Sequence, residues 1–365
     1  MPTDLGHQWT DQELERLERR IARVYWEAWD DLEKTVIDYF ERFQERDEQM
    51  KKLIGTVQNG KTWTEEDYKQ WRLNQIGRGE RFDDLAVKVA ERYTKANETA
   101  IAYVNDDTPS IYSLNRNYAA YTIEQVAGDA GFTLWDEQTV KRLIVEEPDL
   151  MPYYPPEKAV KRGIDLAWGK RQITASVTSS ILRGRSIKGI ADDLQNRISD
   201  MNRTSAIRAA RTAVTGAENA GRMDSYVAAA KMGIKVRKRW IATKDNRTRH
   251  SHAMLDGKTV DYDKPFVSDL GSEMMFPGDP QGAKPGDLYN CRCSMRTVEK
   301  EGTEAEPRQM RVKGPDGRYV LVISYNSTHI RYYDPVLGAE VKVTRKAFEN
   351  SLSLQSNTMY TFSVQ

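Results

Sequence analysis

Four residues of the kinds that bind transition metals lie in two tight pairs of this 365-residue sequence. His250 and His252 are separated by one serine, and Cys291 and Cys293, the chain's two cysteines, are separated by one arginine. Imidazole nitrogen and thiolate sulfur are ligands that Zn²⁺ prefers, and four of them close a tetrahedral structural site. Side chains two positions apart on a strand point to the same side, so each pair could present both members to one ion. The sequence therefore predicts a structural zinc site formed by these four residues.

The same residues admit two other interpretations. Without metal, the cysteines would be small buried residues and the histidines surface residues. A catalytic zinc, as in a nuclease or hydrolase, needs an open coordination position and a nearby base, a role that Asp245 or Asp256 could fill. Four protein ligands would close the site to substrate, so the number of ligands distinguishes a structural zinc from a catalytic one.

The overall composition argues against several classes of protein. Charged residues make up 30% of the chain and hydrophobic residues 39%, and the net charge is only +1. This balance gives no global attraction to membranes or to nucleic acid, which argues against a nucleic-acid-binding module, the third alternative. Apolar runs stay well short of the ~20 residues that span a bilayer, and MPTDLGHQWT lacks the pattern of a signal peptide. Two cysteines in so long a chain provide no disulfide framework, so we expect the protein to be made in the cytoplasm.

The first part of the chain is expected to be helical. Thr10 and Glu13 fit a capping box, with Trp9 and Leu14 in the positions of a hydrophobic staple, so a first helix should begin there. Apolar residues then recur every three or four positions, which forms a stripe along one helix face that could continue to about residue 53. The stripe consists of Leu14, Leu17, Ile21, Val24, Ala28, Leu32, Val36, Tyr39 and Phe43.

Two more helices are expected before the middle of the chain. Thr64, with Asp67 as its partner, fits a second capping box. A further helical stretch at residues 82–104 should end before Pro109, because proline disfavours helix at the residue that precedes it. The aromatic cluster of Tyr25, Trp26 and Trp29 is wider than one core stripe needs. It is either part of the bundle core or, the interpretation that we favour, a surface that docks another subunit.

A second helical region follows the stiff connector LMPYYPP at residues 150–156. Residues 157–198 are predicted to form two helices joined at Gly184–Ser186. Residues 201–233 should form one more helix, with Gly233 as its C-cap. On that helix, the charged residues around Arg222 are predicted to lie on a solvated face or to form intramolecular pairs, in preference to contacting DNA.

The pattern changes after residue 233. IKVRKRWIAT alternates like a strand, Asp256–Gly257 offers a tight turn, and short strands are expected from residue 309 onward. The sequence thus predicts a mainly α fold in three domains. These are a long-helix N-terminal region at residues 1–150, a smaller α+β module at residues 151–300 that holds both ligand pairs, and a C-terminal β appendage at residues 301–365.

The segment that carries the two ligand pairs resembles a family of phage proteins. RTAVTGAENAGRMDSY, WIATKDNRTRHSHAMLDGK and YNCRCSM, with a loop rich in proline and glycine, are similar in order and spacing to phage head-morphogenesis proteins. These are the minor capsid proteins like phage Mu protein F, and the resemblance covers about residues 165–300. The matching positions are Asp245, Arg247, Thr248, His252, Leu255, Asp256, Gly257, Asn290, Cys291, Arg292 and Cys293.

The chain departs from the pattern of this family in two places. Ala213 stands where the family usually has a glutamate, and no cysteine pair accompanies the Asp-x-Arg segment. His252 is then the ligand most like the family's. His250 or Asp245 would be a fourth ligand beside the two cysteines.

The resemblance implies a non-catalytic minor head protein of a tailed phage. Such a protein would lie in the capsid interior of the virion, bind the portal protein through its helical part, and support head assembly or early DNA ejection. Its partners would be the portal and other capsid or scaffolding components. It would contact passing DNA without sequence specificity and would not contact a membrane. Its cofactor would be a structural Zn²⁺.

Overall fold

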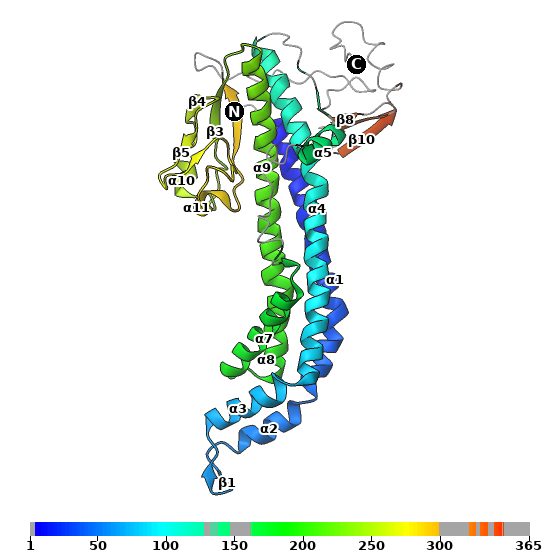
Figure 1. Cartoon of the computed structure of the whole chain (residues 1–365), viewed down its shortest axis with the longest axis vertical. Helices are drawn as coiled ribbons and strands as arrows, with labels where there is room; N and C mark the ends of the chain where they lie inside the picture. The colour runs from blue at the N-terminus through cyan, green and yellow to red at the C-terminus, as the bar shows by residue number, and fades with distance from the viewer. Residues whose placement is uncertain are drawn as a thin grey trace. The chain divides into compact units, whose positions relative to one another are not determined.

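The computed structural model describes residues 4–127, 132, 134–135, 137–146, 161, 163–298, 321–325, 329–334, 339–344 and 346 (Figure 1). Long helices dominate and the strands form small sheets, which confirms the expected mainly α fold with strands near the C-terminus. The LMPYYPP connector lies outside the described residues, as do the strands expected near residues 309–312 and 359–364. In the described part of the chain, no helix is both long and apolar enough to cross a membrane.

The chain forms two compact units, each assembled from segments that are distant in the sequence. The first unit contains residues 1–15, 105–154 and 210–365, and the second contains residues 16–104 and 155–209. Three helices, α1 (Leu5–Glu41), α4 (Glu80–Ala127) and α9 (Asn202–Lys231), contribute residues to both units. The domain boundaries expected near residues 150 and 300 adjoin residues outside the described ranges, so that three-part division stays a prediction.

In its described residues, the second unit is helical apart from one small hairpin. Besides its parts of α1, α4 and α9, it contains α2 (Gln44–Lys52), α3 (Glu65–Ile76), α7 (Leu166–Leu182), α8 (Ile187–Gln195) and a π-helical segment η1 (Asn196–Met201). Strands β1 (Val57–Gln58) and β2 (Lys61–Thr62) pair antiparallel between α2 and α3.

The apolar stripe of α1 lies in the core of this second unit. Its buried residues there are Leu17, Ile21, Val24, Ala28, Leu32, Val36 and Tyr39. The aromatic cluster beside the stripe is divided. Tyr25 is buried and its hydroxyl donates to Oδ1 of Asn97 at 2.6 Å, whereas Trp26 is 54% exposed. The guanidinium of Arg203 lies over the Trp26 ring, 5.5 Å from its centre. Only part of the cluster is therefore available as a docking surface.

Several helix boundaries confirm the capping signals of the sequence. Thr64 and Asp67 form a reciprocal capping box at the start of α3. The hydroxyl of Ser186 accepts the backbone N–H of Gly189 at the start of α8, and Gly184 before it has a left-handed φ of 72°. Gly233 follows the end of α9 with a φ of 82°. These signals are local, and local chemistry was sufficient to predict them.

The predicted start and end of α1 are wrong. The helix begins at Leu5, and Asp4 caps it by accepting the backbone N–H of His7 at 2.9 Å. Thr10 is inside the helix, where its hydroxyl donates to the carbonyl of Gly6 and accepts from the side chain of Asn115. The helix ends at Glu41, and a short turn separates it from α2. A tertiary contact with α4 therefore replaced the predicted cap.

The predicted helix end before Pro109 is also wrong, because α4 continues through this residue to Ala127. A proline inside a helix costs about 3 kcal/mol or more, since it removes one hydrogen bond and crowds the preceding turn. Residues 111–120 are all buried, so the turns that follow gain packing that offsets this cost. The hydroxyl of Ser110 also donates to the carbonyl of Asp107 beside the proline.

The first unit combines helix ends with the strands of the chain's second half. Besides its parts of α1, α4 and α9, it contains α5 (Glu137–Glu146), which precedes α9 in the chain. The elements that follow α9 are β3 (Arg237–Ile241), α10 (His250–Ala253), β4 (Thr259–Asp261), β5 (Phe266–Val267), β6 (Glu273–Met274), α11 (Pro285–Leu288), β7 (Ser294–Val298), β8 (Leu321–Tyr325), β9 (His329–Asp334) and β10 (Ala339–Thr344). Strand β3 pairs antiparallel with both β4 and β7, β5 pairs with β6, and β9 pairs with both β8 and β10.

The sheet β4-β3-β7 lies beside α9 (Figure 1). Tyr226 and Ala229 of α9 share a buried cluster with Val236 and Met295 of the sheet region. Helix α9 also approaches α4 closely at Gly221. A Cβ at this position would collide with the carbonyl oxygen of Tyr112. Glycine is thus required where the two helices meet.

The pKa shift of His7 predicts a stability that depends on pH. Ring nitrogen Nδ1 lies 2.9 Å from Oε1 of Glu218, a buried carboxylate of α9. Burial opposes the charged ring, but the negative charge of Glu218 outweighs this effect and raises the pKa of His7 from 6.5 to about 9. Between pH 6.5 and about pH 9, the folded chain keeps this proton and the unfolded chain loses it. The stabilisation is therefore complete below the unfolded pKa and is lost as the pH rises through the folded pKa.

We expect the free energy of unfolding, measured by urea denaturation, to fall by about 2 kcal/mol between pH 6.5 and pH 9. His7→Gln should remove most of that fall, because glutamine does not titrate there. A variant with the same pH dependence as the unaltered chain would show that other groups cause it.

Candidate metal centre

His252 is positioned by the short helix α10, which lies in the chain between β3 and β4 of the sheet β4-β3-β7. The chain leaves β3, turns at Asp245 and forms α10, in which His252 is buried at 2% exposure. The imidazole packs edge-to-face on the indole of Trp240 from β3, with ring centres 5.3 Å apart. The indole in turn contacts the ring of Phe266, 5.2 Å away. This apolar packing holds the imidazole in one place.

The two cysteines directly precede β7, and α9 holds their backbone. Asn290 has a left-handed φ of 60°, which turns the chain into the Cys-Arg-Cys segment. The hydroxyl of Thr215 donates to the carbonyl of Cys291 at 2.6 Å, and the amide of Asn219 donates to the carbonyl of Cys293 at 3.0 Å. The backbone of the cysteine pair is therefore fixed by side chains of α9.

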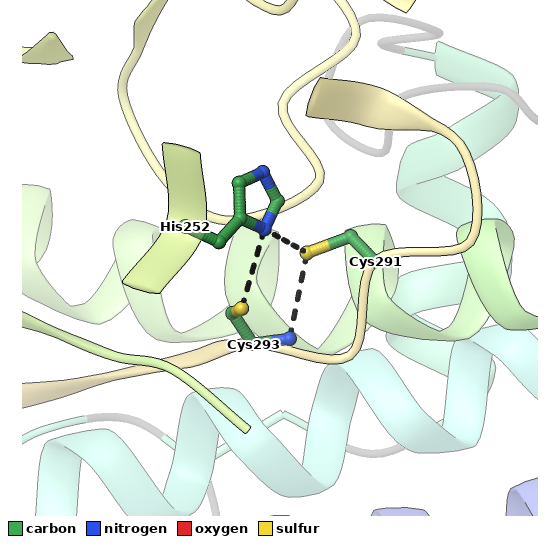
Figure 2. A group of neighbouring side chains, drawn as sticks. All are labelled: His252, Cys291 and Cys293. Atoms are coloured by element: carbon green, nitrogen blue, oxygen red, sulfur yellow. Dashed lines mark hydrogen bonds between the residues drawn. The ribbon is translucent and has the colours of Figure 1, made fainter. Parts of the chain in front are cut away.

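His252, Cys291 and Cys293 come together in a buried cluster (Figure 2). Nδ1 of His252 lies 3.6 Å from Sγ of Cys291 and 3.4 Å from Sγ of Cys293. One potential ligand atom from each residue lies within 4.8 Å of the other two. The backbone N–H of Cys293 also points at Sγ of Cys291, at 3.4 Å. One nitrogen and two sulfurs thus converge on one point.

The surroundings favour a thiolate at one of the two cysteines. A hydrogen bond from Cys291 is the main cause that lowers the pKa of Cys293 to about 5. The same interaction with Cys293, together with burial, raises the pKa of Cys291. Thiolate is the form that binds metal, so the cluster offers a negative sulfur, a second sulfur and an imidazole nitrogen. This donor set fits Zn²⁺, which prefers sulfur and nitrogen ligands.

The predicted fourth ligand, His250, does not join the cluster. The prediction placed both histidines on a strand, but they lie on helix α10, where residues two apart point in different directions. His250 has a side chain that is 81% exposed, and its Nε2 lies 3.8 Å from a carboxylate oxygen of Asp269. The structure brings together three of the four sequence-predicted ligands.

The two aspartates considered as a fourth ligand or a base also lie outside the cluster of ligand atoms. The side chain of Arg292 donates to Asp245 at 2.6 Å, and this hydrogen bond lowers the pKa of Asp245 to about 2. So acidic a carboxylate is a poor base near neutral pH. Asp256 accepts the backbone N–H of Ala242 at 3.0 Å and pairs with Lys244 at 2.9 Å. Both aspartates thus stabilise the turns around the centre.

One charged residue next to the cluster, Asp287, was not predicted from the sequence. Asp287 of α11 is fully buried, and its Oδ1 lies 3.5 Å from Nε2 of His252. Asp287 lies two residues after Pro285, the first residue of α11, so its local sequence signal is that of a helix start. No spacing pattern connected it to His252, because the two residues meet only through the tertiary fold.

Comparison with known proteins defines the class of this module. Residues 171–296 match the family described as "Phage Mu protein F like protein". The matched segment includes all of α9, the first three residues of β7 and all three clustered residues. Residues 171–296, which we call the Mu F-like module, are therefore similar to this family of phage proteins, as the sequence suggested.

Two curated proteins are similar over a longer stretch. The chain is 28% identical over 229 residues to "Minor head protein GP7" of Bacillus phage SPP1, which covers 62% of this chain and 71% of that protein. It is 27% identical over 220 residues to "NAD(+)--arginine ADP-ribosyltransferase EFV" of Enterococcus faecalis. That match covers 57% of this chain but only 43% of the transferase, so it extends over less than half of the enzyme. Comparison with solved structures gave no significant match.

Proposed function

We propose that this chain is a minor head protein that binds the portal inside the procapsid and supports head assembly or DNA ejection without catalysing a reaction. The observation that carries the proposal is the match to the Mu F-like family, joined to the similarity with a minor head protein over most of that protein's length. Other capsid or scaffolding components would be further partners, and contacts with passing DNA would lack sequence specificity.

The helical second unit is the part that we assign to the portal. Its helices α1 and α4 are long and their outer faces are charged, which suits a protein that reaches a neighbouring subunit. Among the described residues of this unit, Trp26 is an exposed aromatic one, and aromatic residues are enriched where protein surfaces bind each other. We therefore expect Trp26 to contribute to portal binding.

Co-expression with the portal protein of the same phage, followed by affinity capture and size-exclusion chromatography, tests this function. The unaltered chain should co-elute with the portal, and Trp26→Ala should weaken the complex about tenfold or more, as truncation of an interface aromatic commonly does. Met254→Ala is the matched control, because Met254 is similarly exposed at 55% but belongs to the other unit. Failure of the unaltered chain to bind portal would contradict portal binding, whereas a normal complex with Trp26→Ala would contradict only the assigned surface.

We also propose that the cluster of His252, Cys291 and Cys293 binds a structural Zn²⁺. When bound, the ion would connect α10 to the segment before β7 and so stabilise a module whose loops are rich in proline and glycine. The support is the convergence of three soft donors within 4.8 Å in a buried place.

A catalytic zinc remains the second candidate for one specific reason. Three protein ligands, rather than four, are the number typical of catalytic zinc, and the cluster has three. We favour the structural role because all three residues are at most 3% exposed and the candidate base Asp245 is strongly acidic. Hydrolysis of DNA or of ester substrates by the zinc-loaded chain, absent in a Cys293→Ser variant, would reverse this preference.

A further inference from the structure

The imidazole of His252 lies between two different kinds of acidic group. Nδ1 faces the sulfurs of Cys291 and Cys293 (Figure 2), and Nε2 lies 3.5 Å from Oδ1 of Asp287. A neutral imidazole carries one proton, so one nitrogen donates and the other accepts. Whichever group holds the proton decides whether the nitrogen beside the sulfurs is free to bind a metal.

Three serine hydroxyls fix the carboxylate of Asp287. Its Oδ2 accepts hydrogen bonds from Ser268 at 2.7 Å and from Ser272 at 2.5 Å, and its Oδ1 accepts one from Ser251 at 2.7 Å. The hydroxyl oxygens of Ser268 and Ser272 each accept a backbone N–H, at 3.1 Å and 3.0 Å, so their protons are directed at the carboxylate. A carboxylate has about four acceptor positions, and these bonds leave one position on Oδ1, the oxygen nearest His252.

The hydrogen bonds also keep Asp287 charged. An ionised carboxylate only accepts hydrogen bonds, so three hydroxyl donors suit it, whereas a protonated carboxyl would need an acceptor for its own proton. With no exposed surface, the remaining acceptor position has no access to bulk water. The facing N–H of an imidazole is the group placed to fill it.

Among the described residues, Nε2 of His252 lacks a hydrogen-bond partner, just as Oδ1 of Asp287 has an acceptor position left. It is buried and has no hydrogen-bond partner in the described part of the chain, although the Asp287 carboxylate is 3.5 Å away. A normal N–H···O bond is about half an ångström shorter, and an unpaired buried donor costs about 1–3 kcal/mol. A small movement of the imidazole toward the carboxylate would satisfy both groups.

We propose that Asp287 is the positioning residue of this centre: its carboxylate holds the proton of His252 on Nε2 and leaves the Nδ1 lone pair directed at the two cysteine sulfurs. The proposal rests on the zinc site of the proposed function and deepens it. Metal-bound histidines commonly donate their second N–H to a carboxylate, which fixes the tautomer and makes the ligand more basic. The serines of α10 and of the β5–β6 turn build this arrangement into the fold.

The test uses the full-length chain and the near-isosteric variant Asp287→Asn, with zinc affinity measured by competition against a chromogenic chelator. The variant should bind zinc about 10- to 100-fold more weakly, the usual effect of losing such a partner. Asp279→Asn is the control, because Asp279 is a buried carboxylate of the same module that accepts backbone N–H groups at 2.8 and 2.9 Å. Equal affinity in Asp287→Asn and the unaltered chain, or an equal loss in both variants, would overturn the proposal.

Nuclear magnetic resonance of the zinc-free chain with ¹⁵N-labelled histidine provides the readout that a purely structural role would not change. The His252 signals, assigned by their absence in His252→Gln, should show the proton on Nε2 in the unaltered chain and a mixture of tautomers in Asp287→Asn. A proton on Nδ1, or identical tautomers in both chains, would overturn the proposal. If the unaltered chain binds no zinc, the zinc site fails, but the tautomer measurement still decides the role of Asp287.

Discussion

Exchange of both cysteines, in a Cys291→Ser, Cys293→Ser variant, is expected to abolish zinc binding and to destabilise the Mu F-like module by several kcal/mol. The variant keeps one of the three clustered ligands, and a serine hydroxyl is a hard, neutral donor that does not replace a thiolate. In zinc-finger peptides the metal contributes on the order of 10 kcal/mol to folding. The effect should be smaller here, because Trp240 and Phe266 form a buried apolar cluster around the site that does not depend on metal.

Elemental analysis of the purified chains measures the first effect, and thermal unfolding with and without a strong chelator measures the second. The unaltered chain should contain one zinc and lose stability on chelation, whereas the variant should contain none and be insensitive to chelator. Metal-free protein from the unaltered sequence would contradict the proposal and leave the cysteines as small core residues.

The variant His250→Gln tests whether His250 contributes to metal binding. Because the His250 side chain is 81% exposed and pairs with Asp269, this variant should retain its zinc and its stability. Loss of zinc in His250→Gln would mean that metal binding rearranges α10 and restores the four-ligand site that the sequence suggested.

The correct predictions from sequence concern residues whose structure is decided by near neighbours. Thr64 and Ser186 cap helices through groups three residues away, and Gly233 ends α9 because of its own backbone freedom. The cysteine pair was recognisable for a similar reason, since one intervening residue in an extended segment keeps both sulfurs close together. Short-range geometry is a property that a sequence displays directly.

The incorrect predictions concern residues whose role depends on a distant partner. Thr10 is not a cap because Asn115, 105 positions away, binds its hydroxyl. Pro109 does not end α4, because the residues after it are buried. His250 was paired with His252 by spacing alone, but the short helix between β3 and β4 points them apart. For Thr10 and Pro109, a tertiary contact outweighed a local preference of about 1–3 kcal/mol.

Arg222 was predicted to lie on a solvated face or in an intramolecular pair; the structure shows the pair and buries the residue at 2% exposure, with a partner that the sequence did not indicate. Its guanidinium donates to both carboxylate oxygens of Asp4, at 2.6 and 2.9 Å, across 218 positions of the chain. It also donates to the carbonyl of Met295 at 2.8 Å and to Oδ1 of Asn115. The N-terminus of α1 is thereby joined to α9 and β7 within the first unit, through a residue of the Mu F-like module.

Arg222→Leu is expected to lower the free energy of unfolding by about 3–5 kcal/mol, the usual cost of leaving buried charges without their partner. Asp4 and Glu218 would both lose the arginine, because Glu218 also lies 3.2 Å from the guanidinium. Both acids are nearly inaccessible to water. Urea denaturation of the unaltered chain and the variant at pH 7 measures the difference. Lys34→Ala is the control: its pair with Asp38 is exposed, so its loss should be hardly detectable.

The dependence of this loss on pH distinguishes unpaired charge from lost packing. In the unaltered chain, burial opposes the charge of Asp4, but Arg222 outweighs it and lowers the pKa of Asp4 to about 2, so its contribution is lost only as the pH falls toward that value. In Arg222→Leu, burial raises the pKa of the same carboxyl, so the folded variant takes up a proton and gains stability as the pH falls from 7 to 5. The difference between the two chains should therefore narrow over that range. A difference that stays constant from pH 7 to pH 5 would attribute the loss to the packing of the arginine side chain, and the ion pair would then have little part in holding the N-terminus of α1 to the module.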